Sequence, residues 1–204
     1  MFRNKTLLLG TRNQGKVSEF RALLQPISWD LISLQDALIH EDIEETGDTL
    51  EENAILKARR YASLSGQWTL ADDSGLEVEV LNGEPGVKSH RFAGENATDQ
   101  DRINLLLKRL EDVPTEKRQA KFHSVIAIAS PQGEIRLSEG ICKGIITFEP
   151  RGTKGFGYDP IFEIPKIGQT FGELGFKEKN IWSHRAIAAQ IAVETLNNIK
   201  IFDG

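Results

Sequence analysis

The first 24 residues contain a strand, a glycine-bounded turn and an amphipathic helix in direct succession. The apolar run KTLLLG (5–10) is typical of a buried strand, and GKVSEFRALL (15–24) repeats its apolar residues on one helical face. A strand that turns directly into a helix buries the apolar sides of both against a further layer. The opening therefore predicts a domain that mixes helices with a β-sheet.

Later segments continue the pattern of helices interleaved with strands. DTLEENAILKARRYASL (48–64) predicts a helix with Asp48 as its cap and Glu51 three residues on. Residues 98–114 predict a helix that Pro114 stops, and a last helix is expected from about Ser183 to Ile199. On that last helix we expect Ile187, Ile191 and Leu196 to face inward.

Two segments predict strands in the middle of the chain. WTLADDSGLEVEVL (68–81) reads as a strand, a polar break and then an alternating strand. Residues 120–150 read as a meander of three strands with a turn at Pro131, Gln132 and Gly133. Helices and strands alternate early and antiparallel strands follow, which predicts the α/β class.

Composition narrows the range of partners. A chain of 204 residues without repeats or a long linker predicts one domain over residues 1–204. A net charge of -5 argues against nucleic acid as the main partner, and no apolar run is long enough for a signal peptide or a membrane span. Cys142 is the single cysteine, which excludes an internal disulfide and indicates a reducing compartment. We expect a cytoplasmic protein without a membrane partner.

The turn GTRNQGKV (10–17) is a candidate phosphate site. Gly, four residues, Gly and Lys between a strand and a helix let backbone N–H groups and the helix N-terminus meet a phosphate. A P-loop has the same spacing but continues with a Ser or Thr that binds Mg²⁺, where this chain has Val17. An anion-binding turn of another kind is therefore favoured, and a P-loop-like NTPase or kinase that releases or transfers the terminal phosphate stays as the alternative.

Two adjacent carboxylates close an apolar strand in ADDSG (71–75). Asp72 and Asp73 would repel each other unless a cation or hydrogen-bond donors offset their charge. Mg²⁺ is usually held by one or two carboxylates together with phosphate oxygens. The pair therefore indicates a metal site. Most charges of the acidic run at residues 41–53, namely Glu41, Asp42, Glu51 and Glu52, are typical of a solvated face.

Lys57 lies on an otherwise apolar stripe of the second predicted helix, one turn after Asn53. Such a lysine either extends its charged end to solvent or faces a polar cavity. The sequence leaves both alternatives open.

A third candidate is RGTKGFGYDPIF (151–162), where glycines flank Phe156 and Tyr158 ahead of Asp159. Glycines let the backbone approach a flat ligand, an aromatic ring stacks on a base, and a carboxylate accepts from ring N–H groups. A tight connection between strands is the alternative for this stretch alone.

Together these stretches resemble one family, the inosine/xanthosine triphosphate pyrophosphatases, which remove non-canonical purine nucleoside triphosphates. The resemblance is carried by TRNQGKVSEF, EETGDTLEENAILKA, ADDSGLEVEVLNGEPGVKSHRFAG, FGYDPIF and EKNIWSHRAIA, which run from Thr11 to Ala188. It implies an elongated α/β fold, with a long mixed β-sheet flanked by helices in two lobes and a central active-site cleft. It also implies a homodimer that hydrolyses ITP, dITP and XTP to the monophosphate and pyrophosphate with Mg²⁺.

The resemblance implies a role for each matching position. Asp73 would be the proton acceptor, Glu45 and Asp73 the metal ligands, and Lys57 a cation that neutralises phosphate charge. The substrate would be bound by Thr11, Arg12, Asn13, Gln14, Gly15, Lys16, Ser74, Phe156, Gly157, Tyr158, Asp159, Lys179, His184 and Arg185.

The tripeptide Ser-His-Arg occurs twice, at residues 89–91 and 183–185, and the resemblance makes the second copy the ligand-binding one. His90 stands where members of the family commonly have Ala, so a solvated loop residue is expected there. Arg12 stands where Gly is common and would place a second cation near the phosphates. An arginine donor aimed at a 6-oxo group would reject adenine, whose 6-amino group is itself a donor.

Overall fold

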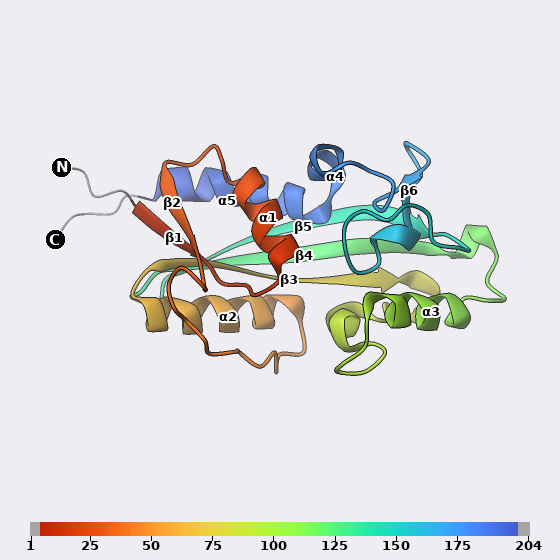
Figure 1. The fold of residues 1–204 in the computed structure, drawn as a ribbon, viewed down its shortest axis with the longest axis horizontal. Helices are drawn as coiled ribbons and strands as arrows, with labels where there is room; N and C mark the ends of the chain where they lie inside the picture. The colour runs from red at the N-terminus through yellow and green to blue at the C-terminus, as the bar shows by residue number, and fades with distance from the viewer. Residues whose placement is uncertain (1–4, 200–204) are drawn as a thin grey trace. The chain divides into compact units, whose positions relative to one another are not determined.

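The structure is a computed structural model that describes residues 5–199, and its strands form a mixed sheet flanked by helices (Figure 1). The predicted α/β class is therefore confirmed. The strand order is β2-β1-β3-β4-β5-β6-β7. The strands are β1 (Lys5–Leu9), β2 (Trp29–Ser33), β3 (Trp68–Val78), β4 (Gln119–Ala129), β5 (Ile135–Ile146), β6 (Phe162–Ile164) and β7 (Gln169–Thr170). The helices are α1 (Gln14–Leu23), α2 (Leu50–Ser65), α3 (Asp99–Arg109), α4 (Phe176–Trp182) and α5 (His184–Asn198).

The chain divides into two compact units. Unit 1 contains the described residues up to Asp73, residues 124–140, and the described residues from Arg185 onward. Unit 2 contains residues 74–123 and 141–184. Strands β3, β4 and β5 each contribute to both units.

Unit 1 is built on parallel pairing of β1 with β2 and with β3. Side chains of a strand alternate between its two faces. Leu7 and Leu9 accordingly join one core cluster with α1 and α5, whereas Leu8 packs against Tyr61 of α2 on the other face. Figure 1 shows α1 and α5 on one side of these strands and α2 on the opposite side.

The last helix differs from the prediction in the residues that it buries. Ile187 and Ile191 are 37% and 43% exposed, so the expectation that they face inward is wrong, whereas Leu196 is buried as expected. The inward positions hold small residues, Ala188, Ala189 and Ala192. Small side chains let the helix backbone approach the sheet closely, which a simple count of large apolar residues does not reveal. The helix itself begins at His184.

Three other expectations are corrected. Helix α2 is capped by Thr49, which forms a capping box with Glu52, rather than by Asp48. The prediction that the strand is interrupted at ADDSG is wrong, because β3 continues through these residues. Residues 120–150 contain the two long strands β4 and β5 instead of three, although the turn after Ser130 is present.

The core of unit 2 joins helix α3 to the sheet. Ile103 and Leu106 of α3 pack with Leu76 and Val78 of β3. A group of aromatic rings from Phe122, Phe162 and Phe171 continues this core, with ring centroids 4.7–5.8 Å apart. No helix among residues 5–199 is long and apolar enough to cross a membrane.

Candidate active site

The turn between β1 and α1 presents a helix N-terminus. Gly10 donates its N–H to the Leu70 carbonyl at 2.7 Å, and the Asn13 side chain caps α1 by accepting the Lys16 N–H at 3.1 Å. The first N–H groups of a helix have no partner within the helix, so such an end attracts anions. Val17 is 6% exposed and belongs to the apolar core, which removes the position where a P-loop needs a hydroxyl.

The side chain of Arg12 contacts the loop that precedes α2. Its guanidinium donates to the Glu41 carbonyl at 2.8 Å and lies 3.7 Å from the Asp42 carboxylate. The side chain is 42% exposed. It therefore joins the turn to the loop before α2.

Asp72 and Asp73 are neighbours on β3, and alternation along a strand sends their side chains to opposite faces. Lys16 Nζ lies 3.2 Å from Asp72 Oδ1 on the face of α1. Lys57 Nζ lies 3.3 Å from Asp73 Oδ1 on the face of α2, and Asn53 donates to Asp73 Oδ2 at 3.2 Å. Each carboxylate thus has its own cation, which is how two adjacent charges are tolerated in a buried strand.

The two carboxylates differ in their acidity. Burial alone would raise the pKa of Asp72, but the nearby charges of Lys16 and Arg185 hold it well below its ordinary value. Burial raises the pKa of Asp73 above its ordinary value, because Lys57 and Lys16 only partly offset it. Asp72 is therefore a permanent anion, and Asp73 is the more basic of the two.

Lys57 is 8% exposed, so the alternative in which it extends to solvent is wrong. Its Nζ donates to Glu45 Oε1 at 2.5 Å as well as to Asp73. Burial alone would lower the pKa of Lys57, but the carboxylates of Asp73 and Glu45 outweigh this effect, so the pKa lies above its ordinary value. Lys57 faces a polar site that these two carboxylates share.

Glu45 and Asp73 have the chemistry that Mg²⁺ requires. Their oxygens converge on one cation, the ammonium of Lys57, so both carboxylates already face a common positive charge. Within residues 5–199 no three His, Cys, Asp or Glu side chains are grouped as a complete metal site. Mg²⁺ commonly takes one or two carboxylates and completes its shell with water and substrate phosphate, which fits this pair.

Arg185 occupies the opposite face of β3 from Lys57. Its guanidinium donates to Asp72 Oδ2 at 3.1 and 3.2 Å and to Glu19 Oε2 at 2.6 Å. Arg185 is 1% exposed and Glu19 3%. Burial alone would lower the pKa of Arg185, but the carboxylates of Asp72 and Glu19 outweigh this effect. The pKa lies above its ordinary value, so the charge of Arg185 is permanent. Lys16, Asp72, Arg185 and Glu19 form a buried ion network within unit 1.

The loop 155–159 in unit 2 is organised by Asp159. Its Oδ2 accepts the Phe156 N–H at 2.9 Å and the Lys179 ammonium at 2.6 Å. Lys179 Nζ lies 4.6 Å from the Phe156 ring centroid, within range of a cation–π contact. Gly155 has φ +77°, and a Cβ there would lie 1.9 Å from Asp159 Oδ2, so only glycine permits this approach.

Tyr158 and His184 are buried in the same unit. The Tyr158 hydroxyl donates to the Ser89 carbonyl at 2.9 Å, and burial raises its pKa. The His184 ring stacks on Phe122 with centroids 4.7 Å apart and an interplanar angle of 10°. Both side chains are therefore fixed in orientation.

The predicted site residues are divided between the two units. Unit 1 holds Thr11, Arg12, Asn13, Gln14, Gly15, Lys16, Glu45, Lys57, Asp73 and Arg185. Unit 2 holds Ser74, Phe156, Gly157, Tyr158, Asp159, Lys179 and His184.

Sequence reasoning did not select Glu19, Asn53 or Asp99 as site residues, although each bonds to one of these groups. Asn53 carried a signal, because it lies one turn before Lys57 on the same apolar stripe. Glu19 lies three residues after Lys16, which also gives it a helical spacing.

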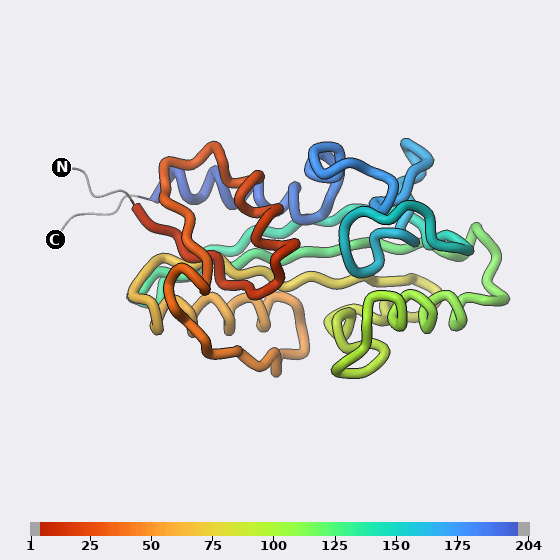
Figure 2. Tube along the Cα trace, viewed as in Figure 1, coloured from red at the N-terminus to blue at the C-terminus, as the bar shows by residue number. Residues whose placement is uncertain are grey.

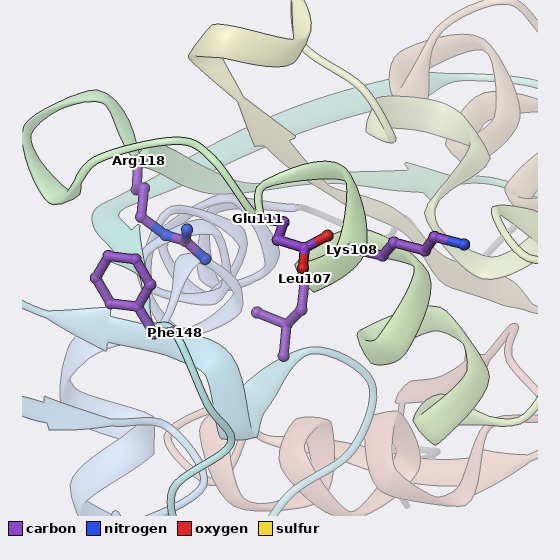
Figure 3. Close-up of a pocket in the computed structure, with 5 residues that line it drawn as sticks. All are labelled: Leu107, Lys108, Glu111, Arg118 and Phe148. Carbon is purple, nitrogen blue, oxygen red and sulfur yellow. The ribbon is translucent and has the colours of Figure 1, made fainter.

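A surface pocket of about 520 Å³ lies elsewhere in unit 2 (Figure 3). The guanidinium of Arg118 donates to four backbone carbonyls and lies 4.2 Å from the Phe148 ring centroid. Leu107, Lys108 and Glu111 complete the lining. None of the predicted site residues lies in this pocket.

Comparison with known proteins agrees with the sequence resemblance. The Ham1 family model matches residues 7–195. The chain is 47% identical to the dITP/XTP pyrophosphatase of Desulforamulus reducens over 96% of this chain and 97% of that protein. It is 49% identical to the protein of the same name from Halalkalibacterium halodurans, over 89% of this chain and 93% of that protein.

Solved structures give the same result. A HAM1 protein from Coxiella burnetii has a TM-score of 0.87 and 42% identity, over 96% of this chain and all of that chain. The nucleoside-triphosphatase, or dITP/XTP pyrophosphatase, from Mycobacterium abscessus has a TM-score of 0.73 and 40% identity, over 95% of this chain and all of that chain. With a family match over nearly its whole length and relatives of this similarity, the chain belongs to the Ham1 family.

Proposed function

We propose that the chain hydrolyses non-canonical purine nucleoside triphosphates, namely ITP, dITP and XTP, to the nucleoside monophosphate and pyrophosphate, and so cleanses the nucleotide pool. The observation that carries the proposal is the group formed by the buried Asp73 and Lys57 with the partly buried Glu45, together with the helix N-terminus at the start of α1. This group combines a basic carboxylate with cations for a phosphate chain. The names of the relatives support the substrate class.

The phosphate end of the substrate is proposed to lie on residues 11–16. Backbone N–H groups at the start of α1 meet phosphate oxygens, and Lys16 adds a positive charge. Lys57 contributes a second cation, which its raised pKa keeps charged at neutral pH. Mg²⁺ held by Glu45 and Asp73 would offset the remaining negative charge of the triphosphate.

Asp73 is proposed to take the proton of the attacking water. A carboxylate whose pKa is raised is a better proton acceptor than an ordinary one, and burial raises the pKa of Asp73. Asn53 holds one of its oxygens at 3.2 Å, which fixes the orientation of the carboxylate. Asp72 is not proposed for this step, because Lys16 and Arg185 keep its pKa low.

The base is proposed to bind in unit 2, with Phe156 stacking on it. The Gly157, Tyr158 and Asp159 segment with Lys179 and His184 completes the base site, and Ser74 contacts the substrate. The positively charged Lys179 beside the Phe156 ring supplies a donor suited to a 6-oxo group. Arg185 is proposed as a second donor to that group, although its guanidinium also donates to Asp72 and Glu19.

The test is incubation with ITP, XTP, ATP and GTP in the presence of Mg²⁺, with orthophosphate and pyrophosphate both quantified. We expect pyrophosphate from ITP and XTP and little product from ATP. Orthophosphate as the main product would favour an enzyme that removes the terminal phosphate. Binding of ITP without turnover would favour a nucleotide sensor. Omission of Mg²⁺ in the same assay tests the cofactor.

We also propose that the chain works as a homodimer in the cytoplasm. The family resemblance supports the dimer, and the single cysteine supports a reducing compartment. Sedimentation equilibrium on the full chain measures the assembly. A mass equal to that of one 22.8 kDa chain at micromolar concentration would contradict the dimer.

A further inference from the structure

The loop that carries Phe156 is held by a hydrogen bond from a distant segment of the chain, in addition to its internal bond to Asp159. Asp99, the first residue of α3, accepts the Gly157 N–H on its Oδ2 at 2.7 Å. The two residues are 58 positions apart in the chain. Figure 2 shows the loop, in cyan, beside the start of the green helix α3.

Consecutive N–H groups of this loop are therefore held by two different carboxylates. Asp159 accepts the Phe156 N–H from within the loop, and Asp99 accepts the Gly157 N–H from α3. Gly157 has φ +62°, a backbone conformation that residues with a Cβ rarely adopt. In this conformation its N–H points to Asp99. With both N–H groups held, the peptide planes on the two sides of Phe156 have fixed orientations, and with them the direction in which its side chain leaves the backbone.

Asp99 is itself held in place. Arg102 donates to Asp99 Oδ1 at 2.5 Å, and its other terminal nitrogen donates to the His90 and Ala97 carbonyls at 2.7 Å each. Arg102 is 7% exposed. Burial alone would raise the pKa of Asp99, but the bonds from Arg102 and Gly157 outweigh this effect. The pKa is therefore below its ordinary value, and Asp99 stays a charged acceptor.

We propose that Asp99 is a positioning residue that fixes the base-stacking ring of Phe156 through the Gly157 N–H. This role rests on the proposed function of Phe156 as the base-stacking residue. Hydrogen bonds to charged acceptors are stronger than neutral ones, so loss of this bond releases the loop more than loss of an ordinary turn contact. The purine site then loses preorganisation, and substrate binding weakens while the phosphate chemistry in unit 1 is unchanged.

The test compares four variants of the full chain. Asp99→Ala removes the acceptor, and Asp99→Asn retains an oxygen that accepts the Gly157 N–H. Asp101→Ala is the matched control, because Asp101 is an acidic residue of the same helical turn whose bonds go to Thr98 in the capping box. Phe156→Ala reports on the base site itself.

We expect Asp99→Ala to raise KM for ITP about tenfold with kcat within about twofold of wild type. Asp99→Asn should give a KM between those of wild type and Asp99→Ala, because its neutral oxygen still accepts the Gly157 N–H but more weakly. Asp101→Ala should lower the thermal midpoint and leave KM within about twofold. In hydrogen exchange, the Gly157 amide should exchange faster in Asp99→Ala and at the wild-type rate in Asp101→Ala.

Three results would overturn the proposal in distinguishable ways. If Phe156→Ala raises KM and Asp99→Ala does not, the base site stands and Asp99 has no positioning role. If Asp101→Ala raises KM as much as Asp99→Ala, the effect belongs to the start of α3 in general. An unchanged KM for Phe156→Ala removes the base site, and the role of Asp99 with it.

Discussion

Arg185→Ala should destabilise the protein strongly, because it breaks the buried ion network of unit 1. Arg185 is 1% exposed and is shared between Asp72 and Glu19, which are 1% and 3% exposed. Removing one partner of a buried ion pair costs about 3 to 5 kcal/mol, because the charge left behind has no compensation. Lys16 still lies 3.2 Å from Asp72, so we expect a loss near the lower figure, about 3 kcal/mol.

The measurement is the free energy of unfolding in urea, followed by the fluorescence of Trp29, Trp68 and Trp182. Arg91→Ala is the control, because it removes the arginine of the other Ser-His-Arg copy. Native domains have about 5 to 15 kcal/mol of stability, so Arg185→Ala should remain folded but with a clearly lower midpoint. We expect less than about 1 kcal/mol for Arg91→Ala.

A double-mutant cycle isolates the pair. Glu19→Gln and Arg185→Met are measured singly and together, and Met keeps an unbranched apolar stem in place of the arginine. Contacting residues in one network couple by about 0.5 to 3 kcal/mol, and we expect the double variant to lose less than the sum of the single losses. A purely additive result would show that Glu19 and Arg185 do not stabilise each other.

Kinetics on the same variants separate stability from recognition of the base. Loss of fold lowers catalytic efficiency for ITP and ATP together, whereas loss of a base contact lowers it for ITP alone. The proposed 6-oxo contact predicts that Arg185→Ala reduces the ITP-to-ATP ratio by about ten- to a hundredfold, with a much smaller change for Arg91→Ala. If the unfolding free energy of Arg185→Ala stays within about 0.5 kcal/mol of wild type, the structural reasoning is refuted.

Three further outcomes follow from the same contacts. Asp73→Asn should abolish pyrophosphate release from ITP while the chain stays folded, since the amide cannot take a proton, and near wild-type turnover would remove Asp73 from the mechanism. Lys57→Met should lower kcat by about a hundredfold, and it should also lower the thermal midpoint because Asp73 loses its cation. Burial raises the pKa of Cys142 to about 11, so the folded state holds the thiol proton more tightly than the unfolded state. The Cys142 contribution to stability is present below pH 9 and is lost between about pH 9 and 11, and a thiol reagent at pH 8 should react only after unfolding.

Local patterns in the sequence predicted the features that depend on local physics. The strand-turn-helix at residues 5–24 follows from apolar periodicity, and it places Lys16 at a helix N-terminus. The sequence placed Lys57 on the apolar stripe of α2 and left open whether its charged end reaches solvent, and the structure pairs that end with Asp73. The predicted N-cap of α2, Asp48, lies one residue before the observed N-cap, Thr49. Both residue types are good caps, and local spacing does not rank them.

Contacts between distant segments could not be read from the sequence. Asp72 and Asp73 look like one acidic pair, yet continuous β3 geometry sends them to separate helices and gives them opposite pKa shifts. The Asp99 bond to Gly157 joins segments that no periodicity connects. Such pairs depend on the sheet order, which single-sequence patterns do not fix.

The two Ser-His-Arg copies show how identical residues acquire different roles from their surroundings. In the first copy Ser89 accepts the Leu76 N–H and donates to the Gly86 carbonyl, so it fixes a turn. The Ser89 carbonyl in turn accepts the hydroxyl of Tyr158. The first copy therefore supports the loop of the proposed base site through its backbone while His90 stays exposed. A substitution at Ser89 that distorts this turn is therefore expected to reach the proposed base site through Tyr158, whereas Arg91→Ala leaves these bonds in place.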